Sequence, residues 1–164
     1  MIELSLAKDE APGSSAIYHK NRQITPMPIL REDKDIKHAL QTCKTICVVG
    51  ISPDPSKPSH FVSDVLQSKG FKLFFVNPNY EGQKILGQRV FASLRDIPDE
   101  IDILDVFRKP SAIPELAEEA KKKGFKTFWM QPGAENPKVV KELDSEGYNV
   151  VYGRCAKVES LRLL

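Results

Sequence analysis

The sequence predicts a doubly wound α/β domain with a mostly parallel sheet of five or six strands. Short apolar runs rich in Val, Ile and Phe alternate with amphipathic segments from about residue 45 onward. Continuously apolar strands are typical of parallel sheets covered on both faces. The chain has 164 residues, 41% of them apolar, which is enough for one core. We therefore expect one domain over residues 33–164, preceded by an extended arm over residues 1–32, which contains three prolines and shows no periodicity.

The individual elements follow from local patterns. Ile36, Ala39 and Leu40 lie at helical spacing and predict a short helix that begins near Asp33. The predicted strands are TICVVG (45–50), FKLFFV (71–76), QRVFA (88–92), IDILDVF (101–107), FKTFWM (125–130) and YNVVY (148–152). Between them we expect a helix from a Ser59 cap to Gly70, a single turn with Ser93 and Asp96 as a capping pair, a helix over 111–124 and a helix over 136–146.

Composition argues against several classes of function. The 24 basic and 22 acidic residues leave a net charge of +2, which gives no global field to attract nucleic acid or an anionic membrane. No apolar run approaches the ~20 residues that span a bilayer. The opening MIELSLAKDEAPG has neither the pattern of a signal peptide nor that of a transit peptide. We expect a cytoplasmic protein with no nucleic-acid or membrane partner.

The three cysteines do not suggest a disulfide framework or a metal site. Cys43, Cys47 and Cys155 are an odd set without a secretory signal. The CxxxC pair formed by the first two has no Cys or His pair nearby to complete a zinc site. Cys47 lies within the apolar run ICVV and is predicted to be a buried thiol.

The strand ends are where a ligand site is expected. In doubly wound sheets, ligands bind beyond the carboxyl ends of the strands, at the crevice where the strand order reverses. After the first predicted strand, Ser52, Lys57 and Ser59 supply donors beside a helix N-terminus, an arrangement that suits a phosphate or pyrophosphate. A surface turn rich in Pro and Ser, capped by Ser59 for stability alone, is the alternative.

Two signals of an NAD site are missing. The run GISPDP from Gly50 lacks the GxGxxG pattern, and Asn77-Pro78-Asn79 stand where an Asp or Glu would bind the ribose. A nucleotide would therefore be held differently. Asn77 can hydrogen-bond a base or ribose while Pro78 fixes the turn, or the dipeptide is a simple turn former.

The later strand ends add further candidates. Arg108 and Lys109 place two cations at the mouth of the expected cleft, where they could bind a phosphate or simply be solvated. Gln131 and the turn amides after it are well placed for a polar chain, whereas Trp129 is expected in the core. Cys155 lies between Arg154 and Lys157, an arrangement that can activate a thiol, but no base is readable beside it.

In this order and spacing, the segments VVGISPDPSKPSH, VNPNYEGQKILGQRVFASLRDIP, DILDVFRKP, WMQPG and GRCAKVE resemble the small CoA-binding domain proteins. Their Rossmann-like fold is similar to the CoA-binding domain of the succinyl-CoA synthetase alpha subunit. The resemblance runs from about Thr45 to the C-terminus and implies coenzyme A or an acyl-CoA as the ligand. CoA is a nucleotide pyrophosphate that does not need the carboxylate used for the ribose of NAD, which accounts for both missing signals.

The resemblance also implies a set of binding residues. Gly50, Ser52, Lys57, Pro58 and Ser59 would surround the phosphates, Asn77 and Pro78 would lie at the adenosine end, and Phe107, Arg108, Gln131 and Gly133 would line the rest. The full set of expected cofactor-binding residues is Gly50, Ile51, Ser52, Lys57, Pro58, Ser59, Asn77, Pro78, Asn79, Phe107, Arg108, Gln131 and Gly133. Asn79 departs from the family, which often has Lys or Arg there, so Lys57 or Lys84 would have to bind that phosphate.

Three functional hypotheses follow. The first is a non-catalytic or regulatory module that binds CoA or an acyl-CoA, since no catalytic constellation is readable. The second is an enzyme that acts on an acyl-CoA thioester with Cys155 or a water as nucleophile. The third, an NAD(P)-linked redox protein, is disfavoured by the missing glycines and by Asn77. A homodimer or an unknown protein partner is left open.

Overall fold

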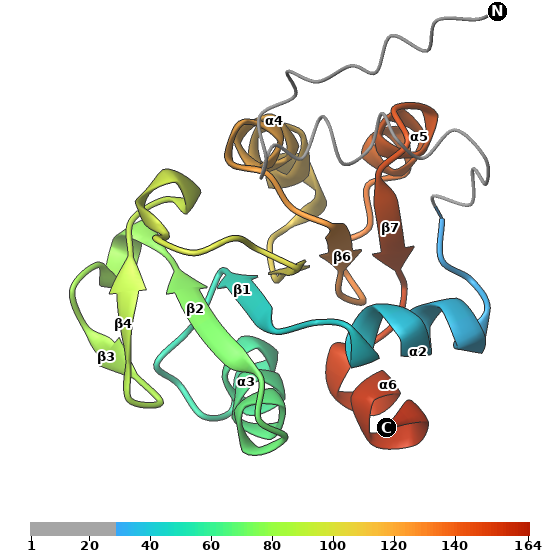
Figure 1. The fold of residues 1–164 in the computed structure, drawn as a ribbon. Helices are drawn as coiled ribbons and strands as arrows, with labels where there is room; N and C mark the ends of the chain where they lie inside the picture. The colour runs from blue at the N-terminus through green and yellow to red at the C-terminus, as the bar shows by residue number, and fades with distance from the viewer. Residues whose placement is uncertain (1–28) are drawn as a thin grey trace, which may run out of the picture.

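The computed structural model describes residues 29–164, which form one sheet with helices on both faces (Figure 1). The sheet has seven strands in the order β3-β4-β2-β1-β5-β6-β7. All neighbouring strands are parallel except β3 and β4, which are antiparallel. The strands are β1 (Thr45–Val49), β2 (Lys72–Val76), β3 (Lys84–Ile85), β4 (Gln88–Phe91), β5 (Ile103–Val106), β6 (Thr127–Met130) and β7 (Asn149–Tyr152).

The helices divide into two layers. α4 and α5 lie on one face of the sheet, and α2, α3 and α6 lie on the other (Figure 1). The helices are α2 (Asp33–Gln41), α3 (Pro58–Ser68), α4 (Ile113–Lys123), α5 (Pro137–Ser145) and α6 (Ala156–Leu163), with 3₁₀ turns η1 (Pro78–Tyr80), η2 (Leu94–Asp96) and η3 (Pro110–Ala112).

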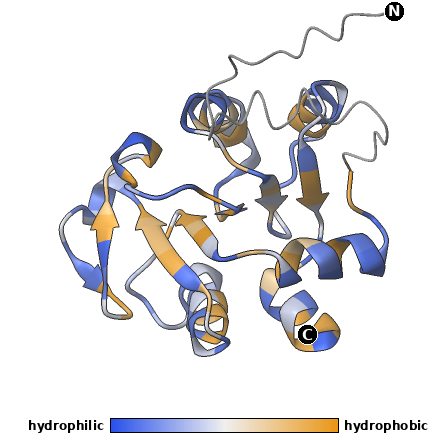
Figure 2. Ribbon diagram, in the orientation of Figure 1, coloured by the Kyte–Doolittle hydropathy of each residue, from blue (hydrophilic) through white to orange (hydrophobic). Residues whose placement is uncertain are grey.

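Side-chain alternation along the strands builds a core on each face. On β5, Leu104 packs with Leu116 and Leu143 of the first helix layer, while its neighbour Ile103 packs with Leu66 of the second. The hydropathy colouring shows apolar strands at the centre and hydrophilic outer faces on the helices (Figure 2). A continuously apolar strand can therefore sit in the middle of the sheet with both faces buried.

The doubly wound α/β fold is confirmed, with two additions. Strand β3 brings the sheet to seven strands, one more than the predicted upper number. It has two residues, too few for a readable period, and it forms a hairpin through Leu86 and Gly87, both at positive φ. Helix α6 was also not predicted, because the eight residues after Cys155 carry no clear apolar stripe.

Little of the predicted arm lies within the described chain. Residues 1–28 are outside it, so the arm and the boundary at residue 33 remain predictions. Ile29 forms a parallel bridge with Val150, and the Leu30 amide donates to the Val150 carbonyl at 2.8 Å. The last residues of the predicted arm thus extend the sheet beside β7. Among the described residues, no helix combines the length and the apolarity that a bilayer crossing requires.

Candidate functional site

The strand order reverses at β1, which pairs with β2 on one side and β5 on the other. Gly50 follows β1 and Phe107 follows β5, so these two residues meet at the switch point. Gly50 has a φ of 92°, and a Cβ there would lie 2.1 Å from the Phe107 carbonyl oxygen. Only glycine permits this approach, which brings the two loops together at the base of a crevice.

A groove of about 390 Å³ opens at this point, lined by the loops after β1, β5 and β6. Its size falls within the roughly 300–1,000 Å³ typical of ligand sites. The predicted site residues that line it are Gly50, Ser52, Lys57, Pro58, Ser59, Phe107, Arg108, Gln131 and Gly133. Lys109, Pro132 and Ala134, which were not in the predicted set, also line it.

The N-terminus of α3 differs from the prediction. The helix begins at Pro58, with Lys57 as its N-cap residue and no side-chain cap, so the predicted Ser59 cap is wrong. The Ser59 hydroxyl instead accepts a hydrogen bond from the Ser52 amide at 3.0 Å and so closes the loop onto the helix. Pro58 has no N–H, and the Ser59 amide makes no hydrogen bond within residues 29–164. With no acidic residue in its first turn, α3 presents a free positive end to the groove.

Three cations surround this helix end. Lys57 and Lys109 are exposed, Arg108 is half-buried, and all three line the groove. None of them forms an ion pair within the part of the chain that the structure describes. The combination of unpaired cations and a free amide at a helix N-terminus is chemically suited to a phosphate group.

The Asn77-Pro78-Asn79 turn is occupied by its own hydrogen bonds. Asn77 Nδ2 donates to the Ile51 carbonyl at 2.9 Å, and Asn77 Oδ1 accepts from the Asn79 amide at 3.0 Å. Its side chain therefore joins two loops, in agreement with the turn-forming alternative. Ile51 is fully buried, and neither it nor Asn77 nor Asn79 lines the groove.

A second hollow of about 220 Å³ lies beside the first. It is formed by the ends of β1 and β2 together with α4, and Pro78 lines it. Arg108 lines both hollows and is the residue that connects them. The wall on the α4 side carries Glu115 and Glu119, and the Glu119 carboxylate accepts a hydrogen bond from the Leu94 amide at 2.9 Å.

Gln131 is turned inward to a carboxylate that the sequence reading did not single out. Its Nε2 donates to Asp105 Oδ1 at 2.6 Å, and the Gln131 side chain is almost fully buried. Asp105 is 0% exposed, and its Oδ2 has no hydrogen-bond partner in the described chain. Burial raises the pKa of Asp105 to about 7, with partial opposition from the Gln131 hydrogen bond. The available signal was an acidic residue inside the apolar strand ILDV.

Gly133 and Trp129 also have partners within the protein. The Gly133 amide donates to Glu135 Oε2 at 2.8 Å, so this turn amide is already satisfied. Trp129 is fully buried, as predicted, and its Nε1 donates to the Arg154 carbonyl at 2.7 Å. Cys47 is likewise buried, as predicted, and the three thiols are free. No cluster of three or more metal-ligating side chains occurs among residues 29–164.

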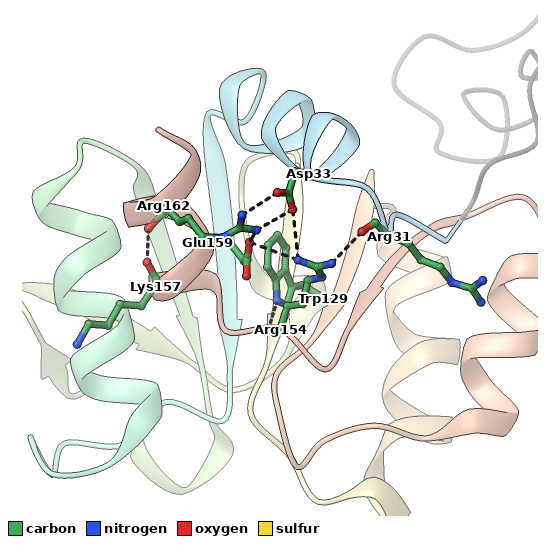
Figure 3. Close-up of polar contacts among 8 residues, drawn as sticks. Arg31, Asp33, Trp129, Arg154, Lys157, Glu159 and Arg162 are labelled. Atoms are coloured by element: carbon green, nitrogen blue, oxygen red, sulfur yellow. Dashed lines mark hydrogen bonds and ion pairs between the residues drawn. The ribbon is translucent and has the colours of Figure 1, made fainter.

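The cations next to Cys155 contact other groups, and Figure 3 shows those of Arg154. Arg154 lies 3.5 Å from Asp33 and 3.6 Å from Glu159, and it donates to the Arg31 carbonyl. Lys157 Nζ lies 5.2 Å from the centre of the Phe61 ring. The two cations that flank the thiol in sequence therefore hold α6 against α2 and α3.

Residues 44–160 match the model of the CoA binding domain family. The chain is 37% identical over 124 residues to the uncharacterized protein YneT of Bacillus subtilis, a match that covers 76% of this chain and 90% of that protein. It is 35% identical over 85 residues to an ADP-forming acetate–CoA ligase II of Archaeoglobus fulgidus, covering 51% of this chain and 12% of that enzyme. A solved structure from Thermus thermophilus has a TM-score of 0.79 and 37% identity, covering 82% of this chain and 100% of that one.

Proposed function

This chain belongs to the CoA-binding domain family, and we propose that it holds coenzyme A or an acyl-CoA in the groove as a non-catalytic or regulatory module. One observation carries the proposal. Lys57, Arg108 and Lys109 line the groove at the N-terminus of α3, and none of them forms an ion pair within the described chain. A cluster of unpaired like charges has an electrostatic cost, and an anionic ligand would offset it.

The two hollows suit the two halves of the ligand. In the larger groove, the Ser59 amide with Lys57 and Arg108 would bind the pyrophosphate. The smaller hollow at Pro78 would take the adenosine end, with Arg108 between the two. The pantetheine arm would then run along the loop after β6, past Gln131 and Gly133. Asn77 and Asn79 would support this arrangement by shaping the turn.

The arrangement favours binding over thioester chemistry. Arg154, next to Cys155, is paired with Asp33 and Glu159, and Cys155 is not among the residues that line the groove. The acyl-CoA enzyme remains the second candidate, because the free thiol of Cys155 follows β7 at the same edge of the sheet. Release of free thiol from acetyl-CoA would favour this candidate, provided that the release is lost in Cys155→Ala.

Calorimetric titration of the purified full chain tests the proposal. We expect CoA and acetyl-CoA to bind and NADH not to bind under the same conditions. The double variant Lys57→Ala/Arg108→Ala should weaken CoA binding by at least about 100-fold, because two charge-assisted contacts are lost. The matched double variant Lys72→Ala/Lys126→Ala, which removes the same charge from paired lysines at the other end of the sheet, should bind normally.

Two outcomes would contradict the proposal. Absence of CoA and acetyl-CoA binding to the folded wild-type chain would reject it. Equal weakening in both double variants would mean that the net charge, rather than the groove, attracts the ligand. Selective binding of NADH would instead support the redox hypothesis.

A further inference from the structure

Asp105 occupies an unusual position for a carboxylate. It lies on β5 near the centre of the sheet, in register with Val48 of β1 and Trp129 of β6. Both neighbours are fully buried, as is Asp105 itself. Its Oδ2 is the one buried side-chain oxygen or nitrogen among residues 29–164 that lacks a hydrogen-bond partner. A buried, half-satisfied carboxylate is costly, so a structural role alone does not account for it.

The single hydrogen bond of Asp105 leads to the groove. Gln131 Nε2 donates to Asp105 Oδ1 at 2.6 Å, and Gln131 lines the groove. An ionised carboxylate can only accept hydrogen bonds, so the NH₂ group of the amide must face it. The opposite atom, Gln131 Oε1, accepts no hydrogen bond from the described residues and is not a fully buried unpartnered atom, so it is available to a ligand in the groove that Gln131 lines.

We propose that Asp105 is a positioning residue, which orients the Gln131 amide so that the groove presents a hydrogen-bond acceptor at this point. This inference rests on the proposed function. The acceptor matches the part of the ligand expected there, because the pantetheine arm carries two amide N–H groups and a hydroxyl. Asp105 would thus favour a ligand with a donor beside the loop after β6 and disfavour one that presents an acceptor.

The same geometry makes the orientation depend on a proton. Burial raises the pKa of Asp105 to about 7, so both of its forms are populated near neutral pH. Protonated Asp105 can donate its O–H to Gln131 Oε1, which reverses the amide and turns Nε2 toward the groove. The groove then presents a donor in place of an acceptor. Loss of the proton from Asp105 restores the first orientation.

The surroundings leave Asp105 as the titrating group. The Cys47 thiol on β1 is in electrostatic contact with it, and burial raises the pKa of that thiol, so it remains neutral. On the same face, the buried polar residues of α3 are Ser59 and Ser63, which do not ionise. The ionisable residues of α2 and α3 are at least partly exposed, and the buried Glu159 of α6 is paired with Arg154 and Arg162.

The first test does not need CoA. In nuclear magnetic resonance spectra of the full chain, the side-chain NH₂ signals of Gln131 should shift between pH 5.5 and 8.5 with a midpoint near 7. In Asp105→Asn the shift should vanish, while Asp102→Asn, a change just before the other end of β5, should leave it intact. Gln131 signals that do not titrate in the wild-type chain would overturn the inference, whether or not CoA binds.

The second test measures CoA affinity over the same pH range. Relative to Asp105→Asn, which keeps the contribution of the ligand's own phosphates, wild-type CoA affinity should fall as Asp105 becomes protonated, and Asp102→Asn should behave as the wild type does. Asp105→Asn should bind about three- to tenfold more weakly at pH 8 and show no such fall, because Asn satisfies either orientation of Gln131. The double variant Asp105→Asn/Gln131→Leu should bind CoA little more weakly than Asp105→Asn alone, since both changes affect the same acceptor in the groove.

The two tests separate the claims. Titrating Gln131 signals without CoA binding would reject the proposed function and keep the role of Asp105 in orienting the amide. CoA binding with unchanged affinity and pH profile in Asp105→Asn would reject this role and keep the proposed function.

Discussion

The two ends of the sheet each carry a hollow of similar size, about 390 Å³ at the carboxyl end and about 320 Å³ at the amino end. At the amino end the lining carries charges of both signs, with Lys44 and Lys126 beside Asp99, Glu100 and Asp102. Lys126 pairs with Asp102 at 2.9 Å and Lys72 pairs with Asp99 at 2.6 Å. At the carboxyl end the charged residues of the lining are the cations Lys57, Arg108 and Lys109, none of which forms an ion pair among residues 29–164. Charge of one sign, rather than volume, therefore distinguishes the candidate ligand site.

The same contrast appears at the two ends of β5. Asp102, just before the strand, is partly buried, but hydrogen bonds from Lys126 and the amides of Lys44 and Thr45 outweigh this and hold its pKa below the usual range. Asp105 is fully buried with one hydrogen bond, and its pKa is raised to about 7. One carboxylate stabilises its end of the sheet, and the other is kept at a cost beside the groove.

The largest effect is expected at the switch point. A Cβ at position 50 would lie 2.1 Å from the Phe107 carbonyl oxygen, so Gly50→Ala must displace backbone. We expect it to lower the free energy of unfolding by about 4 kcal/mol or more, measured by urea denaturation. Gly133→Ala is the control, because it has the same φ of 92° and no neighbour within 4 Å. Gly133→Ala should lower the free energy of unfolding by only about 1–2 kcal/mol. Equal losses in the two variants would disprove the close approach of Gly50 to Phe107.

The next effect concerns Asp105 and pH. Because its pKa is higher in the folded protein than the ordinary value of 3.8, the folded state binds this proton more tightly. The stability that protonation of Asp105 contributes to the fold is fully present below about pH 4 and is lost as the pH rises through about 7. Asp105→Asn should remove this dependence and raise the free energy of unfolding by roughly 3 kcal/mol at pH 8. Denaturation curves at pH 5 and 8 check this, and a destabilised variant at pH 8 would contradict it.

A smaller effect is expected for a single groove cation. Arg108→Ala should weaken CoA binding by about 10- to 100-fold, because Arg108 lines both hollows and would make charge-assisted contacts to the ligand. Arg89→Ala on β4, next to the edge strand β3, removes the same charge away from both hollows and should change affinity little. If the two variants bound CoA equally in calorimetry, Arg108 would have no place in the site.

The smallest effect belongs to the amino end. Because the pKa of Asp102 is lowered in the folded protein, its ionised form contributes to stability above about pH 4. This contribution is lost as the pH falls through the folded-state pKa. Asp102→Asn should therefore lower the free energy of unfolding by about 1–2 kcal/mol at pH 7 and by less at pH 3. CoA affinity should be unchanged. A change in affinity would mean that the amino end takes part in binding after all.

Local pattern was sufficient for the fold and for the location of the groove. Apolar runs and the residues at their ends are read from neighbours in sequence, so the loops at Gly50, Phe107 and Gln131 could be expected at one edge. The sequence could not reveal how polar groups pair across loops. The Asn77–Ile51 and Gln131–Asp105 hydrogen bonds each join residues 26 positions apart, and they decide which side chains remain free for a ligand.

Hydrogen–deuterium exchange of the full chain with and without saturating CoA tests most directly which end of the sheet takes the ligand. We expect slower amide exchange in the segments 50–60, 107–113 and 131–135. No change is expected in 42–46 and 99–103 at the amino end. Protection confined to the amino end, or absent from both ends although calorimetry detects binding, would contradict the central claim.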